Sequence, residues 1–147
     1  MSDLRELYQE VILDHGKHPR NFGKPAETTH LAHGDNPLCG DKVTVYLTMD
    51  GDRIAEVMFE GRGCAISMAS ASLMTEVLKG MTEAEAMELF GHFHALVSTE
   101  DADVGDLDKL EVLSGVRQFP MRVKCATLPW HTMKSALAHQ AEPATTE

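Results

Sequence analysis

The sequence is short of basic residues, of cysteines and of long apolar runs, and each shortage limits what the chain can do. It has 13 Lys and Arg against 23 Asp and Glu, so its formal net charge at pH 7 is −10. A phosphate backbone repels such a charge, which argues against nucleic-acid binding. A protein partner with a basic patch suits this charge better, because opposite fields speed the encounter of two proteins.

No apolar run approaches the length of a transmembrane helix. Residues 1–16 alternate charged residues with Leu and Val and contain no apolar segment of a signal peptide. We therefore expect a cytoplasmic protein that does not associate with a membrane. Three cysteines cannot all pair within one chain. Where thiols stay reduced, cysteines that cluster indicate metal binding or reactivity.

The length of 147 residues is that of one domain with its own core. Apolar residues at helical spacing predict a first helix that ends at Gly16. Period-two alternation over 42–49 and 53–60, joined by Asp50-Gly51, predicts a β-hairpin, and we expect a further short strand within 28–33. Helices are then expected over 66–80, over 82–97 behind the capping box of Thr82 and Glu85, over 107–116, and finally to about 139.

This order of elements predicts the α+β class, with a small antiparallel sheet of about three strands packed against helices. We assign residues 1–140 to a single domain and expect 141–147 to be a disordered tail. The chain contains no internal repeats.

The three cysteines occupy distinctive settings. Cys39 lies in a Pro- and Gly-containing loop before the first long strand, and Cys64 follows Gly63 at the start of a predicted helix. Because a proline does not fit inside a helix, Pro129 predicts that the last helix starts at about Lys124, with Cys125 at its N-terminus. Helix N-termini carry partial positive charge and stabilise thiolates.

Together with Asp41, the three cysteines supply four metal donors. They form a complete tetrahedral set for zinc or a partial cradle for an iron–sulfur cluster. Basic neighbours would offset the negative charge of deprotonated ligands; they are Lys42, Arg62, Arg122 and Lys124. The alternative is that each cysteine is a small core hydrophobe. Since all three share the same kind of setting, we favour metal binding or reactivity over a role in core packing.

Other polar residues give weaker signals. We interpret the eight histidines as surface or helix-capping residues, among which His33 is of interest because it is near Cys39. No Ser-His-Asp arrangement can be defended for Ser67, Ser70 or Ser72, so we expect these serines to pack between helices.

In their order, three segments resemble the U-type iron–sulfur cluster assembly proteins, whose fold is described as SufE/IscU-like. They are the Cys39-Gly40-Asp41 loop before a hairpin, Gly63-Cys64-Ala65-Ile66-Ser67 at a helix start, and the late Cys125. The first helix and Asn21-Phe22-Gly23 also fit, so the resemblance covers about residues 4–139.

Within that family the chain looks closer to the SufU branch than to the IscU branch. Lys124 stands where the IscU pattern has a histidine before the third cysteine. The acidic region from Thr99 to Gln118 looks like the extra segment of SufU. The chaperone-docking motif of IscU, Leu-Pro-Pro-Val-Lys, is replaced by residues 119–124.

The resemblance implies a zinc-dependent sulfurtransferase. It would accept persulfide sulfur from a SufS-type cysteine desulfurase and pass it on to downstream iron–sulfur assembly proteins. Zinc would be held by Cys39, Asp41, Cys64 and Cys125, and Cys39 would be the sulfur acceptor once a histidine of the desulfurase replaces it on the metal. We name Arg122 as a candidate supporting residue for Asp41 or the developing thiolate.

Two alternatives remain open at this point. In the first, the chain is a scaffold on which a transient [2Fe–2S] cluster is built on the same ligands and transferred to apo-proteins, so that iron or a cluster replaces zinc. In the second, a structural zinc domain only docks partners. The sequence does not fix the oligomeric state, the native metal, the downstream sulfur acceptor, or whether Asp41 coordinates directly.

Overall fold

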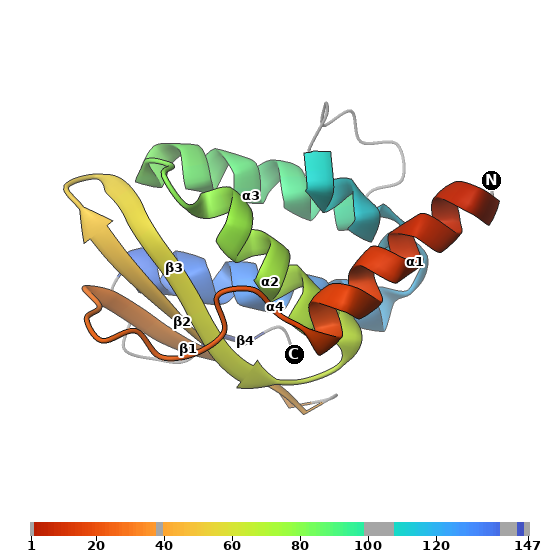
Figure 1. The fold of residues 1–147 in the computed structure, drawn as a ribbon, viewed down its shortest axis with the longest axis horizontal. Coiled ribbons are helices and arrows are strands. Elements are labelled where there is room, and N and C mark those ends of the chain that lie inside the picture. The colour runs from red at the N-terminus through yellow and green to blue at the C-terminus, as the bar shows by residue number, and fades with distance from the viewer. Residues whose placement is uncertain (1, 38–39, 99–107, 139–143, 146–147) are drawn as a thin grey trace.

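The computed structural model describes residues 2–37, 40–98, 108–138 and 144–145. Helices and strands alternate in blocks (Figure 1). In chain order they are α1 (Ser2–Lys17), β1 (His30–Asn36), β2 (Asp41–Asp50), β3 (Arg53–Arg62), α2 (Ala65–Leu78), α3 (Glu83–Ser98), the 3-10 helix η1 (Asp108–Gln118), α4 (Pro120–Leu137) and β4 (Ala144–Thr145). In the part of the chain that the structure describes, no helix is both long and apolar enough to cross a membrane.

The sheet has the strand order β3-β2-β1-β4. The first three strands are antiparallel, and His30 to Asn36 of β1 pairs along its whole length with β2, from Leu47 back to Asp41. Two residues of β4 add a short parallel edge beside Gly34 and Asp35. The predicted α+β class with a small antiparallel sheet is therefore confirmed, and β4 is an addition to it.

The helices cover one face of the sheet, where α2 packs on β3 and α4 packs on β1 and β2 (Figure 1). The only tryptophan, Trp130 of α4, is fully buried and stacks on Phe93 of α3 at 4.7 Å between ring centroids. Its indole N–H donates to Ser70 of α2 over 3.2 Å, and the Ser70 hydroxyl donates to the Ala126 carbonyl. This contact locks three helices together, and it confirms Ser70 as a packing residue.

The structure confirms the two predictions that depend on adjacent residues, the hairpin turn and the capping box. The hairpin turns at Gly51, whose φ of 65° suits glycine. At the start of α3, the Glu85 backbone N–H donates to the Thr82 hydroxyl and the Thr82 N–H donates to the Glu85 carboxylate, as a capping box requires. The strand that we expected within 28–33 instead runs over His30–Asn36, because its partner strand extends to Asp41.

Two further elements differ in detail. The short helix expected at 107–116 is a 3-10 helix over Asp108–Gln118, and much of the acidic segment before it, 99–107, lies outside the described residues. The tail 141–147 also lies mostly outside them; its described residues Ala144 and Thr145 form β4.

The predicted start of the last helix is wrong. α4 begins at Pro120, and Pro129 lies inside it. An interior proline costs roughly 3 kcal/mol in a helix, because it removes one hydrogen bond and its ring crowds the carbonyl four residues earlier. Here eleven residues of α4, from Cys125 to Leu137, are buried. Burial on this scale outweighs the local preference.

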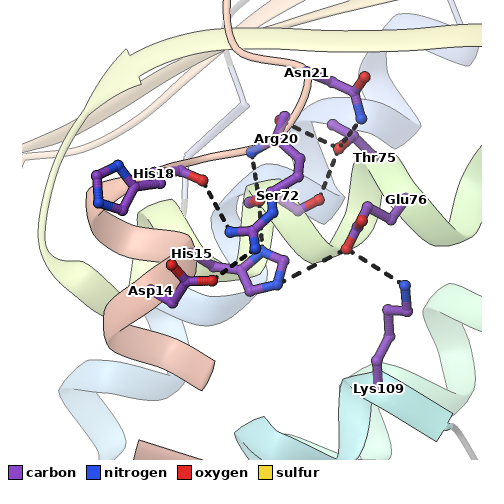
Figure 2. Close-up of polar contacts among 9 residues, drawn as sticks. All are labelled: Asp14, His15, His18, Arg20, Asn21, Ser72, Thr75, Glu76 and Lys109. Carbon is purple, nitrogen blue, oxygen red and sulfur yellow. Dashed lines mark hydrogen bonds and ion pairs between the residues drawn. The ribbon is translucent and has the colours of Figure 1, made fainter. Parts of the chain in front are cut away.

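A polar cluster fastens the end of α1 to α2 (Figure 2). His15 is 6% exposed, and its Nδ1 lies 2.7 Å from the Ser72 hydroxyl, which also accepts the Arg20 backbone N–H. On its other side, His15 Nε2 is 3.8 Å from Glu76, whose carboxylate is 3.4 Å from Lys109 of η1. The interpretation of His15 as a surface or capping residue is therefore wrong.

Candidate metal centre

The first donor, Asp41, opens strand β2 and is 1% exposed. Pairing with Asn36 fixes its backbone, and the strand alternation turns its neighbour Lys42 to the exposed face. A buried carboxylate requires hydrogen bonds or a cation to offset its loss of hydration. One such bond comes from the backbone N–H of Cys64, which donates to Asp41 Oδ1 over 3.0 Å.

The second donor, Cys64, is the N-cap of α2, as the sequence predicts. Its sulfur accepts the Ser67 backbone N–H at 3.4 Å, and it lies 4.0 Å from Asp41 Oδ2. An N-cap sulfur at the positive end of a helix is well placed to carry negative charge.

Gly63 lets the first two donors meet. A Cβ at this position would lie 2.5 Å from Asp41 Oδ1 and 2.9 Å from its carboxylate carbon. A side chain would therefore push Asp41 away from Cys64. In the sequence, the Gly-Cys pair predicts only a helix start, and the role of Gly63 beside Asp41 depends on the fold.

The third donor, Cys125, is 1% exposed and lies in the second turn of α4 rather than at its N-terminus. The argument that a helix end stabilises its thiolate is therefore wrong. Position along α4 brings Cys125 to the site instead, because this helix packs across β1, β2 and α2.

The three donors converge. One ligand atom each of Asp41, Cys64 and Cys125 lies within 4.8 Å of the others, and no other group of three such residues is found in the described part of the chain. Cys39, the fourth predicted ligand, lies outside the described residues. Tetrahedral zinc sits about 2.3 Å from sulfur and about 2.1 Å from carboxylate oxygen, so a sulfur and an oxygen that share it lie about 3.6 Å apart. The 4.0 Å between Cys64 Sγ and Asp41 Oδ2 exceeds this spacing by only a few tenths of an ångström.

The donor chemistry also suits such an ion. Thiolates select zinc or iron–sulfur clusters over magnesium and calcium. Zinc also accepts a carboxylate oxygen beside thiolate ligands. His33 is not part of this group of donors; it is exposed, and its Nδ1 is 2.7 Å from the Thr44 hydroxyl. The three described donors therefore fit zinc without a histidine among them.

Arg122, on the first turn of α4, is the basic residue most clearly coupled to the donors. The negative charge of Cys64 raises the pKa of the Arg122 guanidinium, and hydrogen bonding to Cys125 raises it further. Lys42, Arg62 and Arg122 itself are exposed, and Lys124 is half-buried. Of the four predicted basic neighbours, Arg122 is the one whose side chain reaches two sulfurs.

Fold and site together define a small α+β protein in which two cysteines and a carboxylate meet at one end of the sheet. The chain belongs to the family of the NifU-like N terminal domain, whose model matches residues 7–126. It is a U-type protein of iron–sulfur cluster assembly.

Named relatives come from both branches of this family. The chain is 39% identical to the zinc-dependent sulfurtransferase SufU of Bacillus subtilis, over 95% of each chain. It is 37% identical to the iron–sulfur cluster assembly scaffold protein IscU of Streptococcus pyogenes, over 96% of this chain and 89% of the relative. These identities are too similar to assign a branch.

A solved structure supports the fold. The crystal structure of a protein described as an iron–sulfur cluster assembly scaffold for the SUF system, from Fervidobacterium islandicum AW-1, superposes with a TM-score of 0.83. The two are 39% identical, and the match covers 90% of this chain and 98% of that one.

Proposed function

We propose that this protein accepts persulfide sulfur from a cysteine desulfurase at a zinc centre and passes it on to iron–sulfur cluster assembly. The observation that carries this proposal is the convergence of Asp41, Cys64 and Cys125. The similarity to a relative named as a zinc-dependent sulfurtransferase supports it. In this role the chain is a cytoplasmic sulfurtransferase, and its partners are the desulfurase and downstream assembly proteins.

Zinc would be held by Cys39, Asp41, Cys64 and Cys125. When bound, it would keep the coordinating thiols deprotonated and moderate their nucleophilicity. The Cys64 N–H and Gly63 hold Asp41 in place for this task, and Ser67 holds the Cys64 sulfur.

In the transfer step, the Cys39 thiolate attacks the outer sulfur of the donor persulfide. A new S–S bond forms on Cys39, the donor S–S bond breaks, and its electron pair leaves with the donor cysteine as a thiolate. The proton stays on the outer sulfur. Because one S–S bond replaces another, as in thiol–disulfide exchange, the step needs no oxidant or reductant. Arg122 would offset negative charge beside Cys64 during this step.

Desulfurase turnover with and without the protein tests the proposal. We expect the wild type to raise turnover at least tenfold and Cys39→Ala to abolish the increase. Arg117→Lys is a suitable control variant, because Arg117 is not a candidate metal ligand; its side chain forms a hydrogen bond to the Leu96 carbonyl. This variant should behave as the wild type. Absence of stimulation by the wild type, or full stimulation by Cys39→Ala, contradicts the proposal.

A second candidate function is a scaffold for a transient [2Fe–2S] cluster. The comparable identity to a relative named as a scaffold favours considering it. Anaerobic reconstitution with iron and sulfide separates the two functions. A cluster that forms on the protein and moves to an apo-acceptor supports the scaffold, whereas zinc that resists exchange with iron supports sulfur transfer.

A further inference from the structure

Two histidines from different helices lie side by side, and neither belongs to the candidate metal centre described above. The ring centroids of His94, on α3, and His131, on α4, are 6.0 Å apart, and the ring planes meet at 82°. Both rings also make edge contacts with Phe90 of α3, at 6.2 Å and 5.0 Å between centroids. This shared aromatic neighbour keeps the two imidazoles together where α3 packs on α4.

The spacing of the two rings is close to that of imidazoles that share one ion. Tetrahedral zinc lies about 2.0–2.1 Å from an imidazole nitrogen, which places the centres of two bound rings about 5 Å apart. The observed separation of 6.0 Å is therefore about 1 Å too long. Because His94 is exposed, its ring can turn to close this gap. His92, two residues before it, faces another side of α3.

The surroundings of both rings favour a free nitrogen lone pair. Burial lowers the pKa of His131, and the charges of His94 and Lys134 lower it further, so this ring is neutral at neutral pH. On His94, Nδ1 lies 3.4 Å from the hydroxyl of Ser98, and that hydroxyl donates its proton to the His94 carbonyl. The Ser98 oxygen is thus an acceptor for Nδ1–H, which leaves Nε2 of the neutral ring unprotonated. Histidines that bind metals are commonly oriented by such a second hydrogen bond.

We propose that His94 and His131 form a second metal site, which takes a divalent ion such as Zn²⁺ or Ni²⁺ and joins α3 to α4. Imidazole suits these ions, whereas magnesium and calcium prefer oxygen ligands. Within the described residues no third His, Cys, Asp or Glu joins the pair, so water completes the coordination. With only two protein ligands the site is weaker than the candidate centre, and it stays empty at zinc concentrations that just fill that centre. The inference does not depend on sulfur transfer.

Trp130 provides a local reporter of this site. It is the only tryptophan of the chain, it precedes His131 on α4, and its ring stacks on Phe90 at 6.1 Å between centroids. Ni²⁺ is paramagnetic, so an ion bound by the two histidines quenches the fluorescence of this indole. Titration of the zinc-loaded protein with Ni²⁺ therefore measures occupancy of the site. A chromophoric chelator in the same cuvette detects any zinc that nickel displaces from the candidate centre.

We expect saturable quenching in the wild type without release of zinc. Loss of a ligand should cost no less than loss of a group that orients one, so His94→Gln and His131→Gln should each raise the apparent Kd for Ni²⁺ roughly tenfold or more. His92→Gln, which removes an exposed histidine of the same helix, is the matched control and should change this Kd less than about twofold. His131 is half-buried; if its substitution disturbs folding, His94→Gln at the exposed position decides.

A variant with tighter binding gives an independent check. Lys134 is exposed and lies one turn after His131 on α4. Lys134→Glu removes a cation and supplies a carboxylate as a third ligand, so the apparent Kd for Ni²⁺ should fall severalfold. Saturating Ni²⁺ should also raise the Tm of the wild type more than that of His94→Gln, because the ion ties two helices of the folded chain together.

Three results would overturn the proposal. The first is quenching that does not saturate. The second is the same Kd for His94→Gln and His92→Gln. The third is quenching that appears only as zinc is released, because nickel is then bound by the cysteines of the candidate centre.

Discussion

Gly63 shows how much one residue controls at the candidate centre. With a hydrogen atom as its side chain, it lets Asp41 approach the Cys64 backbone to hydrogen-bond distance. Asp41 and Cys64 therefore hold each other in position before any metal binds. A residue that orients a ligand in this way commonly affects metal affinity although it binds no metal itself.

Substitution of this glycine provides the residue-scale prediction. Gly63→Ala should lower zinc affinity by about 10–100-fold, because the added Cβ displaces the Asp41 carboxylate. Competition with a chromophoric chelator measures the affinity. Gly115→Ala is the control, since its Cβ meets open space. Unchanged zinc affinity in Gly63→Ala would show that Asp41 does not coordinate.

The attachment of α1 to α2 includes the buried His15, whose pKa is lowered. Burial lowers the pKa of His15, and the nearby charge of Arg20 lowers it further; Glu76 and Asp14 oppose these effects (Figure 2). The unfolded chain then binds a proton more readily than the folded protein between the depressed pKa and the ordinary value of about 6.5. Stability that is present above pH 6.5 is therefore lost as the pH falls through this window.

This element-scale effect can be isolated with His15→Gln, which keeps a hydrogen-bonding group but does not titrate. At pH 8 we expect the variant to be less stable by about 1–3 kcal/mol, as for other disturbed buried hydrogen bonds. The deficit should shrink as the pH falls to 5, because only the wild type pays for protonating His15. Urea unfolding at several pH values measures it, and a deficit independent of pH would refute the assignment.

Which elements could be predicted depends on how local their causes are. The β-hairpin and the capping box follow from adjacent residues, so the sequence predicts both. The start of α4 does not, because the burial of Trp130 and its neighbours overrides Pro129, and that burial depends on α2 and α3. Residue type and setting predict Asp41, Cys64 and Cys125 as candidate ligands, and the structure brings the three together. The roles of Gly63 and Ser67 depend on distances that no sequence pattern contains.

At the scale of the whole molecule, the candidate ligands come from three separate elements: a strand start, a helix cap and a helix interior. Zinc that binds only the folded chain should therefore stabilise all of it. At a free zinc concentration of a thousand times Kd the gain is about 4 kcal/mol, or roughly 10 °C in Tm for a domain of this size.

Removal of the metal tests this expectation. Dialysis against a chelator should lower Tm by roughly that amount, and added zinc should restore it. A Cys64→Ser/Cys125→Ser double variant should show the lower Tm with and without zinc. The same Tm for treated and untreated wild type would exclude a tightly bound structural contribution of the metal.

The spacing of the donors along the chain has a consequence of its own. Asp41 and Cys64 are 23 residues apart, and Cys64 and Cys125 are 125 − 64 = 61 apart. One ion shared by all three would close two consecutive loops, 41–64 and 64–125, as a pair of cross-links would. Each closure removes chain entropy from the unfolded state. An exchange of ligands at the ion would thus relax a constraint that ties the sheet to the C-terminal helix, so the protein's rigidity would report the occupancy of its own centre.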